Sequence, residues 1–154
     1  MSKYSFQVAR LNPEMKTILL VEDNSDDERL TLRALRNLDV PSVIRIARDG
    51  AEALDFLFGD HVGHQIPDLV LLDLKLPKFS GLEVLEKVRA DERTRTLPII
   101  ILTSSDEDRD ISTAYAHGAN SYVRKPVDYD EFIDAVRALG VYWLAMNRFL
   151  DGKR

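Results

Sequence analysis

The chain has 154 residues, of which 45% are hydrophobic and 31% are charged. This is enough apolar material for one buried core and too little length for two ordinary domains. The net charge of -5 argues against direct binding of nucleic acid, and the absence of cysteine excludes disulfides, thiolate metal sites and thiol nucleophiles. Because the sequence has neither a membrane-length apolar run nor a secretory leader, we expect a soluble, cytoplasmic protein that does not bind membranes.

Predicted strands and helices alternate along the chain. Apolar runs with strand composition occur at residues 17–21, 43–47, 68–74, 97–103 and 120–125. Each is followed by a segment with apolar residues at helical spacing, at residues 25–38, 51–58, 80–90, 107–117 and 128–149. Asn24 or Ser25 is expected to cap the first helix, and Gly118 to end the fourth. Such alternation predicts a parallel sheet with helices on both faces and functional groups beyond the carboxyl ends of its strands.

Acidic residues follow two of these strands. Glu22 and Asp23 come directly after the first strand, and Asp73 ends the third. Carboxylates that lie so close together repel one another unless a cation or a proton lies between them. An oxygen-rich site of this kind suits Mg²⁺. Thr103 and Lys125 end the fourth and fifth strands and offer a hydroxyl and a positive charge to the same edge. Such groups would hold the oxygens of a phosphoryl group on Asp73.

Four segments in order carry a family resemblance. They are LLVEDN, DLVLLDLKLPKFSGLEVL, IIILTS and GANSYVRKP. Together they resemble the receiver domain of two-component response regulators, and the resemblance covers about residues 16–147. It implies a flavodoxin-like (βα)5 sheet with strand order 2-1-3-4-5. It also implies that the protein accepts a phosphoryl group from the histidine of a sensor histidine kinase.

The resemblance also assigns a phosphoacceptor and a metal site. Asp73 matches the phosphoacceptor, and Glu22 and Asp23 match the acidic pair that positions Mg²⁺. The backbone carbonyl of Lys75 matches a further metal ligand. Many relatives have two aspartates where this chain has Glu22 and Asp23, and the Lys75 side chain stands at a position that varies in the family.

Thr103 and Tyr122 match the hydroxyl and aromatic switch positions of the family. Lys125 matches the lysine that reaches the phosphoryl oxygens. The resemblance further implies a cis bond between Lys125 and Pro126.

Other chemistries fit the sequence less well. A phosphatase of the haloacid dehalogenase type would have a second aspartate where this chain has Lys75. The acidic run after Asp23 lacks the glycine and glutamate of a calcium loop. His61 and His64 lie in a predicted loop at 60–67 with no clear third metal ligand. A receiver fold that binds partners without phosphorylation remains the alternative to a phosphoacceptor.

The last predicted helix has two apolar faces. The first suits the core and comprises Phe132, Ile133, Val136, Leu139 and Trp143. The second comprises Ala135, Ala138, Tyr142, Met146 and Phe149. We expect the second face to form a homodimer with the fourth helix and fifth strand; the alternatives are packing of the N-terminal arm or of the chain's own end.

The predicted organisation is an N-terminal arm at 1–15, a receiver domain at 16–150 and a tail at 151–154. Because no output domain is expected after residue 150, we expect a signalling protein that acts through protein contacts and is not a classical enzyme. The DLKLP segment and the YWL-containing last helix are similar to the single-domain regulators that pair with bacterial phytochrome kinases.

Overall fold

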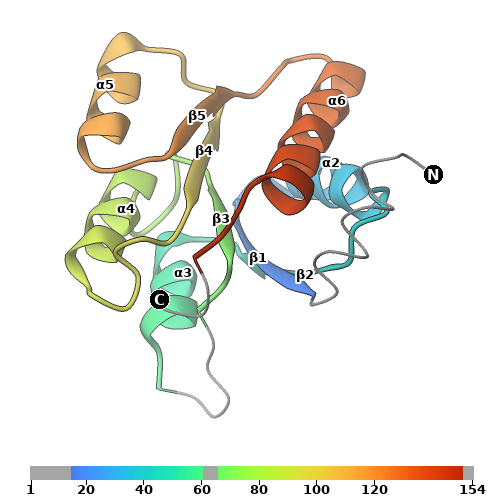
Figure 1. Ribbon diagram of the computed structural model, residues 1–154. Helices are drawn as coiled ribbons and strands as arrows, with labels where there is room; N and C mark the ends of the chain where they lie inside the picture. The colour runs from blue at the N-terminus through green and yellow to red at the C-terminus, as the bar shows by residue number, and fades with distance from the viewer. Residues whose placement is uncertain (1–14, 61–65, 151–154) are drawn as a thin grey trace.

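Five parallel strands form one sheet in the order β2-β1-β3-β4-β5 (Figure 1). The strands of this computed structural model, which describes residues 15–60 and 66–150, are β1 (Lys16–Val21), β2 (Ser42–Ala47), β3 (Leu69–Leu72), β4 (Ile99–Thr103) and β5 (Ser121–Arg124). The order confirms the predicted flavodoxin-like topology. It places β1 and β3 side by side, so that the acidic residues after these two strands meet at one edge.

Helices cover both faces of the sheet. They are α2 (Ser25–Arg36), α3 (Gly50–Phe58), α4 (Gly81–Ala90), α5 (Asp108–Ala116), α6 (Tyr129–Gly140) and the π-helical turn η1 (Val141–Met146). In Figure 1, α3, α4 and α5 lie on one side of the sheet, and α2 and α6 lie on the other.

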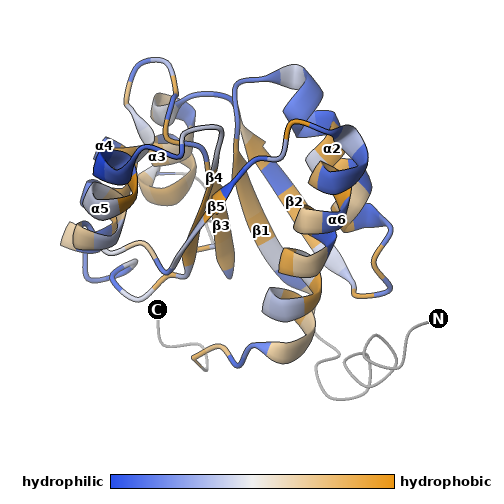
Figure 2. Ribbon diagram, turned by 90° about the horizontal axis from the view of Figure 1, so that it is seen from above, coloured by the Kyte–Doolittle hydropathy of each residue, from blue (hydrophilic) through white to orange (hydrophobic). Residues whose placement is uncertain are grey.

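The central strands are buried on both faces, and their side chains alternate between two apolar cores. Beneath α3, α4 and α5 lie Leu19, Val21, Val70, Leu72, Ile99 and Ile101. Beneath α2 and α6 lie Ile18, Leu20, Leu69, Leu71, Ile100 and Leu102. This two-sided burial explains why the runs in β1, β3 and β4 are continuously apolar instead of alternating with polar residues (Figure 2).

Polar side chains and a glycine set the helix ends. Of the two predicted caps of α2, the structure selects Asn24, whose Oδ1 accepts a hydrogen bond of 2.9 Å from the backbone N–H of Asp27. Gly118 follows the end of α5 with a φ of 99°, a left-handed conformation that favours glycine, and this confirms the predicted stop.

The last helix ends earlier than predicted. Instead of continuing to residue 149, the chain widens into η1 after Gly140 and leaves the helix after Met146. The N–H of Asn147 bonds to the carbonyl of Tyr142, five residues back, at 2.7 Å. Leu144 is buried in this turn, four residues after the buried Gly140.

Phe149 therefore does not lie on the predicted second face of the helix. It belongs to an extended segment after η1, where Lys16 Nζ lies 5.1 Å from the centre of its ring. Phe149 also lines a pocket with Trp143 and with Asn120, which precedes β5. The expectation that Phe149 shares one helical face with Tyr142 and Met146 was wrong, because the helix ends at Met146. Its part in a dimer contact stays a prediction.

Several predictions fall outside the described part of the chain. These are most of the N-terminal arm, the loop histidines His61 and His64, and the tail at 151–154. Within residues 15–60 and 66–150, no helix has the length and apolar character needed to cross a membrane.

Arg89, in the last turn of α4, joins segments at the amino ends of β4 and β5. Its guanidinium donates hydrogen bonds of 2.8–3.3 Å to the backbone carbonyls of Thr94, Arg95, Leu97 and Gly118 and to the side-chain oxygen of Asn120. The same Asn120 oxygen accepts a bond from the N–H of Ile99 at the start of β4. The planar guanidinium of arginine has five N–H groups and can therefore serve several acceptors at once. A lysine ammonium, with three N–H groups, cannot make the same set of bonds.

We expect Arg89→Ala to reduce the free energy of unfolding by about 2 kcal/mol or more, because it leaves several partly buried carbonyls without a donor. The matched control is Arg93→Ala, which removes an exposed pair with Asp91 and a surface contact with the Phe58 ring and should cost much less than Arg89→Ala. Denaturant unfolding measures both, and similar losses in the two variants would contradict this role for Arg89.

Candidate functional site

The residues predicted for the site lie at or just beyond the carboxyl ends of the strands, where main-chain hydrogen bonds hold them. The N–H of Glu22 bonds to the carbonyl of Ala47 at 3.0 Å, and the N–H of Asp73 bonds to that of Val21 at 3.1 Å. The N–H of Lys125 bonds to the carbonyl of Thr103 at 2.7 Å. The parallel ladder thus extends by one residue and fixes the backbone of each group.

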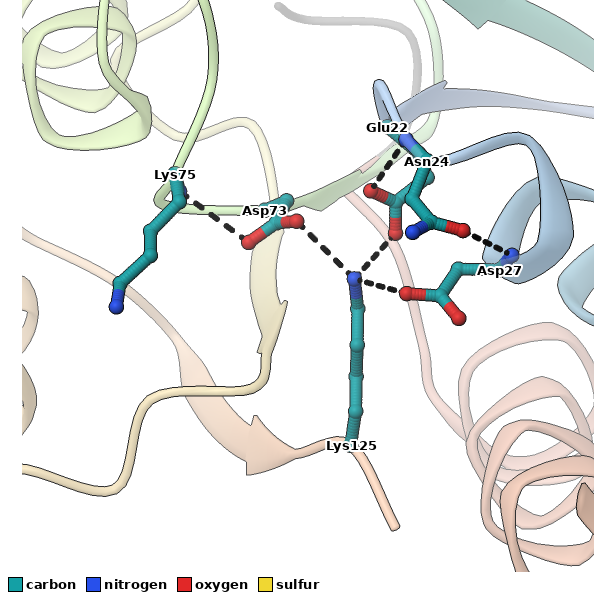
Figure 3. A network of polar contacts seen from close by, with 6 residues as sticks. All are labelled: Glu22, Asn24, Asp27, Asp73, Lys75 and Lys125. Atoms are coloured by element: carbon teal, nitrogen blue, oxygen red, sulfur yellow. Dashed lines mark hydrogen bonds and ion pairs between the residues drawn. The ribbon is translucent and has the colours of Figure 1, made fainter. Parts of the chain in front are cut away.

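Lys125 lies at the centre of a buried ionic network (Figure 3). Its Nζ lies 2.5 Å from an oxygen of Glu22, 2.9 Å from one of Asp27 and 3.0 Å from one of Asp73. Glu22, Asp73 and Lys125 are 2%, 7% and 7% exposed, respectively. One ammonium therefore faces three carboxylates in a region that water hardly reaches, and it cannot neutralise all of them.

The imbalance of charge is reflected in the pKa values. Burial raises the pKa of Glu22 to about 8; the hydrogen bond and charge of Lys125 oppose this only in part, and the charge of Asp73 adds to it. Burial also acts to raise the pKa of Asp73, but Lys125 and the nearby Thr103 hydroxyl outweigh it and hold that pKa below its ordinary value. Although burial acts to lower the pKa of Lys125, its hydrogen bonds to Glu22 and Asp27 raise it. The lysine is therefore a cation, and Asp73 is the more readily ionised of the two buried acids.

The three acids predicted as metal ligands come together. Glu22, Asp23 and Asp73 each offer a carboxylate oxygen, and these oxygens all lie within 4.8 Å of one another. Glu22 and Asp73 are buried, whereas Asp23 is exposed to solvent. A set of hard oxygen donors with excess negative charge and one open side fits a divalent cation such as Mg²⁺, which keeps several of its waters. The N–H of Lys75 donates to Asp73 Oδ1 at 3.3 Å, which places its main chain beside the site.

Thr103 and Tyr122 lie on neighbouring strands at this edge. The Thr103 hydroxyl is fully buried and close enough to lower the pKa of Asp73, yet it completes no hydrogen bond with any residue in the described ranges. Tyr122 is half-buried, and its hydroxyl donates to the carbonyl of Ser105 at 2.8 Å. One predicted switch residue thus has an unused buried hydrogen-bonding group, and the other is tied to the loop that follows β4.

A glycine allows the loop after Asp73 to turn back closely. A Cβ at Gly81 would lie 2.2 Å from the carbonyl oxygen of Asp73, so only glycine lets α4 begin against this main chain. The N–H of Gly81 bonds to the carbonyl of Leu74 at 2.9 Å. The start of α4 thereby fixes the position of the acidic strand end.

The bond between Lys125 and Pro126 is trans, since the described residues contain no cis peptide bond, and the predicted cis bond is therefore wrong. The trans form is the more stable one for this kind of bond by about 0.5–1 kcal/mol unless the surroundings impose the other. Lys125 reaches all three carboxylates with the trans bond in place.

Sequence reasoning missed two polar contacts of the site. Asp27 lies in the first turn of α2, where the helix dipole favours an acid, and nothing in the sequence distinguishes it from its neighbour Asp26 as a partner of Lys125. Asp110 likewise lies in the first turn of α5, and its Oδ2 accepts a hydrogen bond of 2.5 Å from Ser105 Oγ. This contact ties the loop that carries the Tyr122 acceptor to the first turn of α5.

Comparison with known proteins places this geometry among signalling domains. The chain matches the response regulator receiver domain family over residues 18–137. The probable methanogenesis regulatory protein FilR2 of Methanothrix harundinacea is 42% identical over 85% of this chain and 85% of its own length. Response regulator Rcp1 of Synechocystis sp. is 34% identical over 84% of this chain and 89% of its own.

Solved structures agree with the fold. The crystal structure of the Mn²⁺-bound form of response regulator Rcp1 has a TM-score of 0.84 at 31% identity, and the match covers 88% of this chain and 99% of that one. The crystal structure of the phosphorylated cyanobacterial phytochrome response regulator RcpA has a TM-score of 0.85 at 35% identity, with the same coverage of both chains.

We expect the affinity for Mg²⁺ to rise about tenfold between pH 7 and pH 9, because a carboxyl with a pKa of about 8 must lose its proton before it can bind a cation. Glu22 is mostly protonated at the lower pH and mostly ionised at the higher one. Calorimetric titration in buffers of different ionisation enthalpy measures both the affinity and the proton released.

Glu22→Gln is the control for this prediction, because it removes the titrating group and should leave a weaker affinity that is flat over the same range. A wild-type affinity that does not change between pH 7 and pH 9 would contradict the raised pKa of Glu22.

Proposed function

Since the chain belongs to the response regulator receiver domain family, we propose that it is a single-domain regulator that accepts a phosphoryl group on Asp73 from a sensor histidine kinase. Mg²⁺ would be held by Glu22, Asp23 and Asp73, with the backbone carbonyl of Lys75 as a further ligand. When bound, the cation would neutralise negative charge on the transferred group.

In the proposed step, a carboxylate oxygen of Asp73 forms a bond to the phosphorus of a phosphohistidine. The bond from phosphorus to the imidazole nitrogen breaks, and its electron pair leaves with the imidazole of the kinase. Asp73 suits the nucleophile because its lowered pKa keeps it ionised at neutral pH. Since this chemistry uses the protein as acceptor, the chain would act as a signalling protein with only limited reactions on its own phosphoryl group.

The Thr103 hydroxyl carries this proposal. A buried hydroxyl without a hydrogen bond is costly, and this one lies beside Asp73 at the end of β4 and finds no partner within the described ranges. A phosphoryl oxygen on Asp73 would give it an acceptor, and Lys125 would offer a positive charge to another oxygen of the same group.

We propose that the same contact starts the response. As Thr103 turns toward the phosphoryl group, it would change the space available to Tyr122 on the neighbouring strand. The Tyr122 hydroxyl bonds to Ser105, and Ser105 bonds to Asp110 in α5. A shift of Tyr122 would therefore change the start of α5 and favour one of two arrangements of the face formed by α5, β5 and α6.

The proposed input is a bacterial phytochrome kinase. It is supported by the likeness to RcpA, whose crystal structure is described as that of a cyanobacterial phytochrome response regulator. The cytoplasmic location of this chain and the absence of direct contacts with nucleic acid stay predictions from the sequence.

The proposed output is a homodimer through α5, β5 and α6. A groove lies between β5 and α6, and its lining includes Val123, Leu139, Trp143 and two small residues, Ala135 and Ala138. Tyr142 also lines the groove, and Tyr142 and Met146 of η1 are 49% and 52% exposed. Large exposed apolar side chains next to a shallow groove suit a self-complementary contact with a second copy.

We expect Asp73→Asn to abolish Mg²⁺-dependent labelling by an acyl phosphate donor, because a neutral amide oxygen is a much poorer nucleophile than a carboxylate at neutral pH. Intact-mass measurement detects the adduct, and treatment with acid or base tests its acyl phosphate character. Asp134→Asn, which changes an exposed acid on α6, should label like the wild type.

The same experiment separates the alternatives. A module that binds partners without phosphorylation gives no adduct on the wild-type chain. An autonomous phosphatase releases phosphate steadily until the donor is consumed. Labelling of the Asp73→Asn variant at the wild-type level would contradict the assignment of the phosphoacceptor.

We expect Met146→Glu to weaken self-association at least tenfold, because it places a charge in an apolar contact. Analytical ultracentrifugation at micromolar concentrations, with and without a phosphoryl analogue, measures the dimer fraction. Met15→Glu is the matched control, since Met15 is similarly exposed, at 55%, and precedes β1. A wild-type protein that stays monomeric under both conditions would disprove the proposed dimer.

A further inference from the structure

The three hydrogen bonds of Lys125 use its whole donor capacity. A lysine ammonium has three N–H groups, and Glu22, Asp27 and Asp73 accept one each at 2.5, 2.9 and 3.0 Å. No N–H of the lysine remains for an oxygen of a phosphoryl group. A contact between Lys125 and such a group therefore requires that one of these carboxylates give up its bond.

The three partners differ in how easily they can be replaced. The side chains of Glu22 and Asp73 are 2% and 8% exposed, whereas that of Asp27 is 26% exposed. Asp73 keeps one oxygen as an acceptor when the other carries the phosphoryl group, and Glu22 has almost no access to water, whereas Asp27 at the surface can bind water in place of the lysine. Asp27 also lies in the first turn of α2, where the helix dipole stabilises a negative charge even without the lysine.

Asp27 is held in a defined place at the surface of the site. Its backbone N–H donates to Asn24 Oδ1 at 2.9 Å, and the N–H of Asn24 lies 3.4 Å from Glu22 Oε2. In Figure 3 its carboxylate approaches Lys125 from the side opposite to Asp73. Its pull on the lysine is thus directed away from the place where a phosphoryl group would be attached.

We propose that Asp27 is a positioning residue, which holds Lys125 in the unmodified site and competes with a phosphoryl group on Asp73 for the same ammonium. The inference rests on the proposed function, because it needs a phosphoryl group at Asp73. Loss of the Asp27 contact frees one N–H for the incoming oxygen, so that the strength of this contact sets how tightly the site holds the group.

Asp27→Asn tests this inference, with beryllium fluoride as the phosphoryl analogue and Mg²⁺ at a saturating concentration. The signal of protein-bound fluoride in ¹⁹F NMR gives the bound fraction. We expect the Asp27→Asn variant to bind the analogue at least about threefold more tightly than the wild type. The substitution removes one negative charge next to the lysine and leaves an amide oxygen that is a weaker acceptor than a carboxylate.

The matched control is Asp26→Asn, in the same helical turn and with the same change in net charge. Asp26 is 60% exposed at its side chain, where it pairs with Arg29 and makes no contact with Lys125. We expect this variant to change the affinity by less than about twofold, because solvent and salt screen an exposed charge. Asp27→Glu keeps a carboxylate near the lysine and should restore the wild-type affinity.

A purely structural role for Asp27 would change the unfolding temperature, but the affinity for beryllium fluoride would then not differ between Asp27→Asn and Asp27→Glu. Equal effects of Asp27→Asn and Asp26→Asn, or weaker binding in Asp27→Asn alone, would overturn the inference. Failure of the wild-type protein to bind beryllium fluoride would instead disprove the proposed function, so that the two failures can be told apart.

Discussion

The shortage of positive charge around Lys125 is the constraint on which the site depends. Three carboxylates surround one ammonium, and two of them are almost completely buried. Any further negative charge, such as that of a phosphoryl group, raises this imbalance, and a bound cation lowers it. The proposed binding of Mg²⁺, the raised pKa of Glu22 and the proposed competition between Asp27 and an incoming group thus have the same electrostatic cause.

The sheet connects this site to the surface of α5, β5 and α6 that we propose as the dimer contact. The acidic strand ends lie on β1 and β3, whereas Thr103 and Tyr122 lie on β4 and β5 toward α5 and α6. On the proposed function, a change at Asp73 would pass across adjacent strands through a hydroxyl, an aromatic ring and a loop that is bonded to α5. Thr103 and Tyr122 are held by the strand ladder, and Ser105 is bonded to both Tyr122 and Asp110.

Much of this arrangement follows from the sequence, because short-range patterns determine it. The apolar strands β1, β3 and β4, the cap at Asn24 and the glycine after α5 depend on burial and on local backbone geometry. The contact between Asp27 and Lys125 cannot be predicted in this way, because Asp26 and Asp27 are equivalent in the sequence pattern until the helix is placed on the sheet. The end of the last helix was also missed, because the apolar spacing that predicts a helix continues past Met146 and does not distinguish the π-helical turn from an α-helix.

The extension of the main-chain ladder beyond the strands has a consequence for how such a domain can diverge. Glu22, Asp73 and Lys125 are fixed by their backbone N–H groups, which every residue except proline possesses. The scaffold thus specifies positions and leaves the chemical identity at each position open. On the proposed function, a substitution at one of these positions would alter the lifetime of the phosphoryl group or the choice of metal, whereas the backbone hydrogen bonds of the ladder would stay in place. A domain built in this way can acquire new timing for a new pathway and keep its fold unchanged.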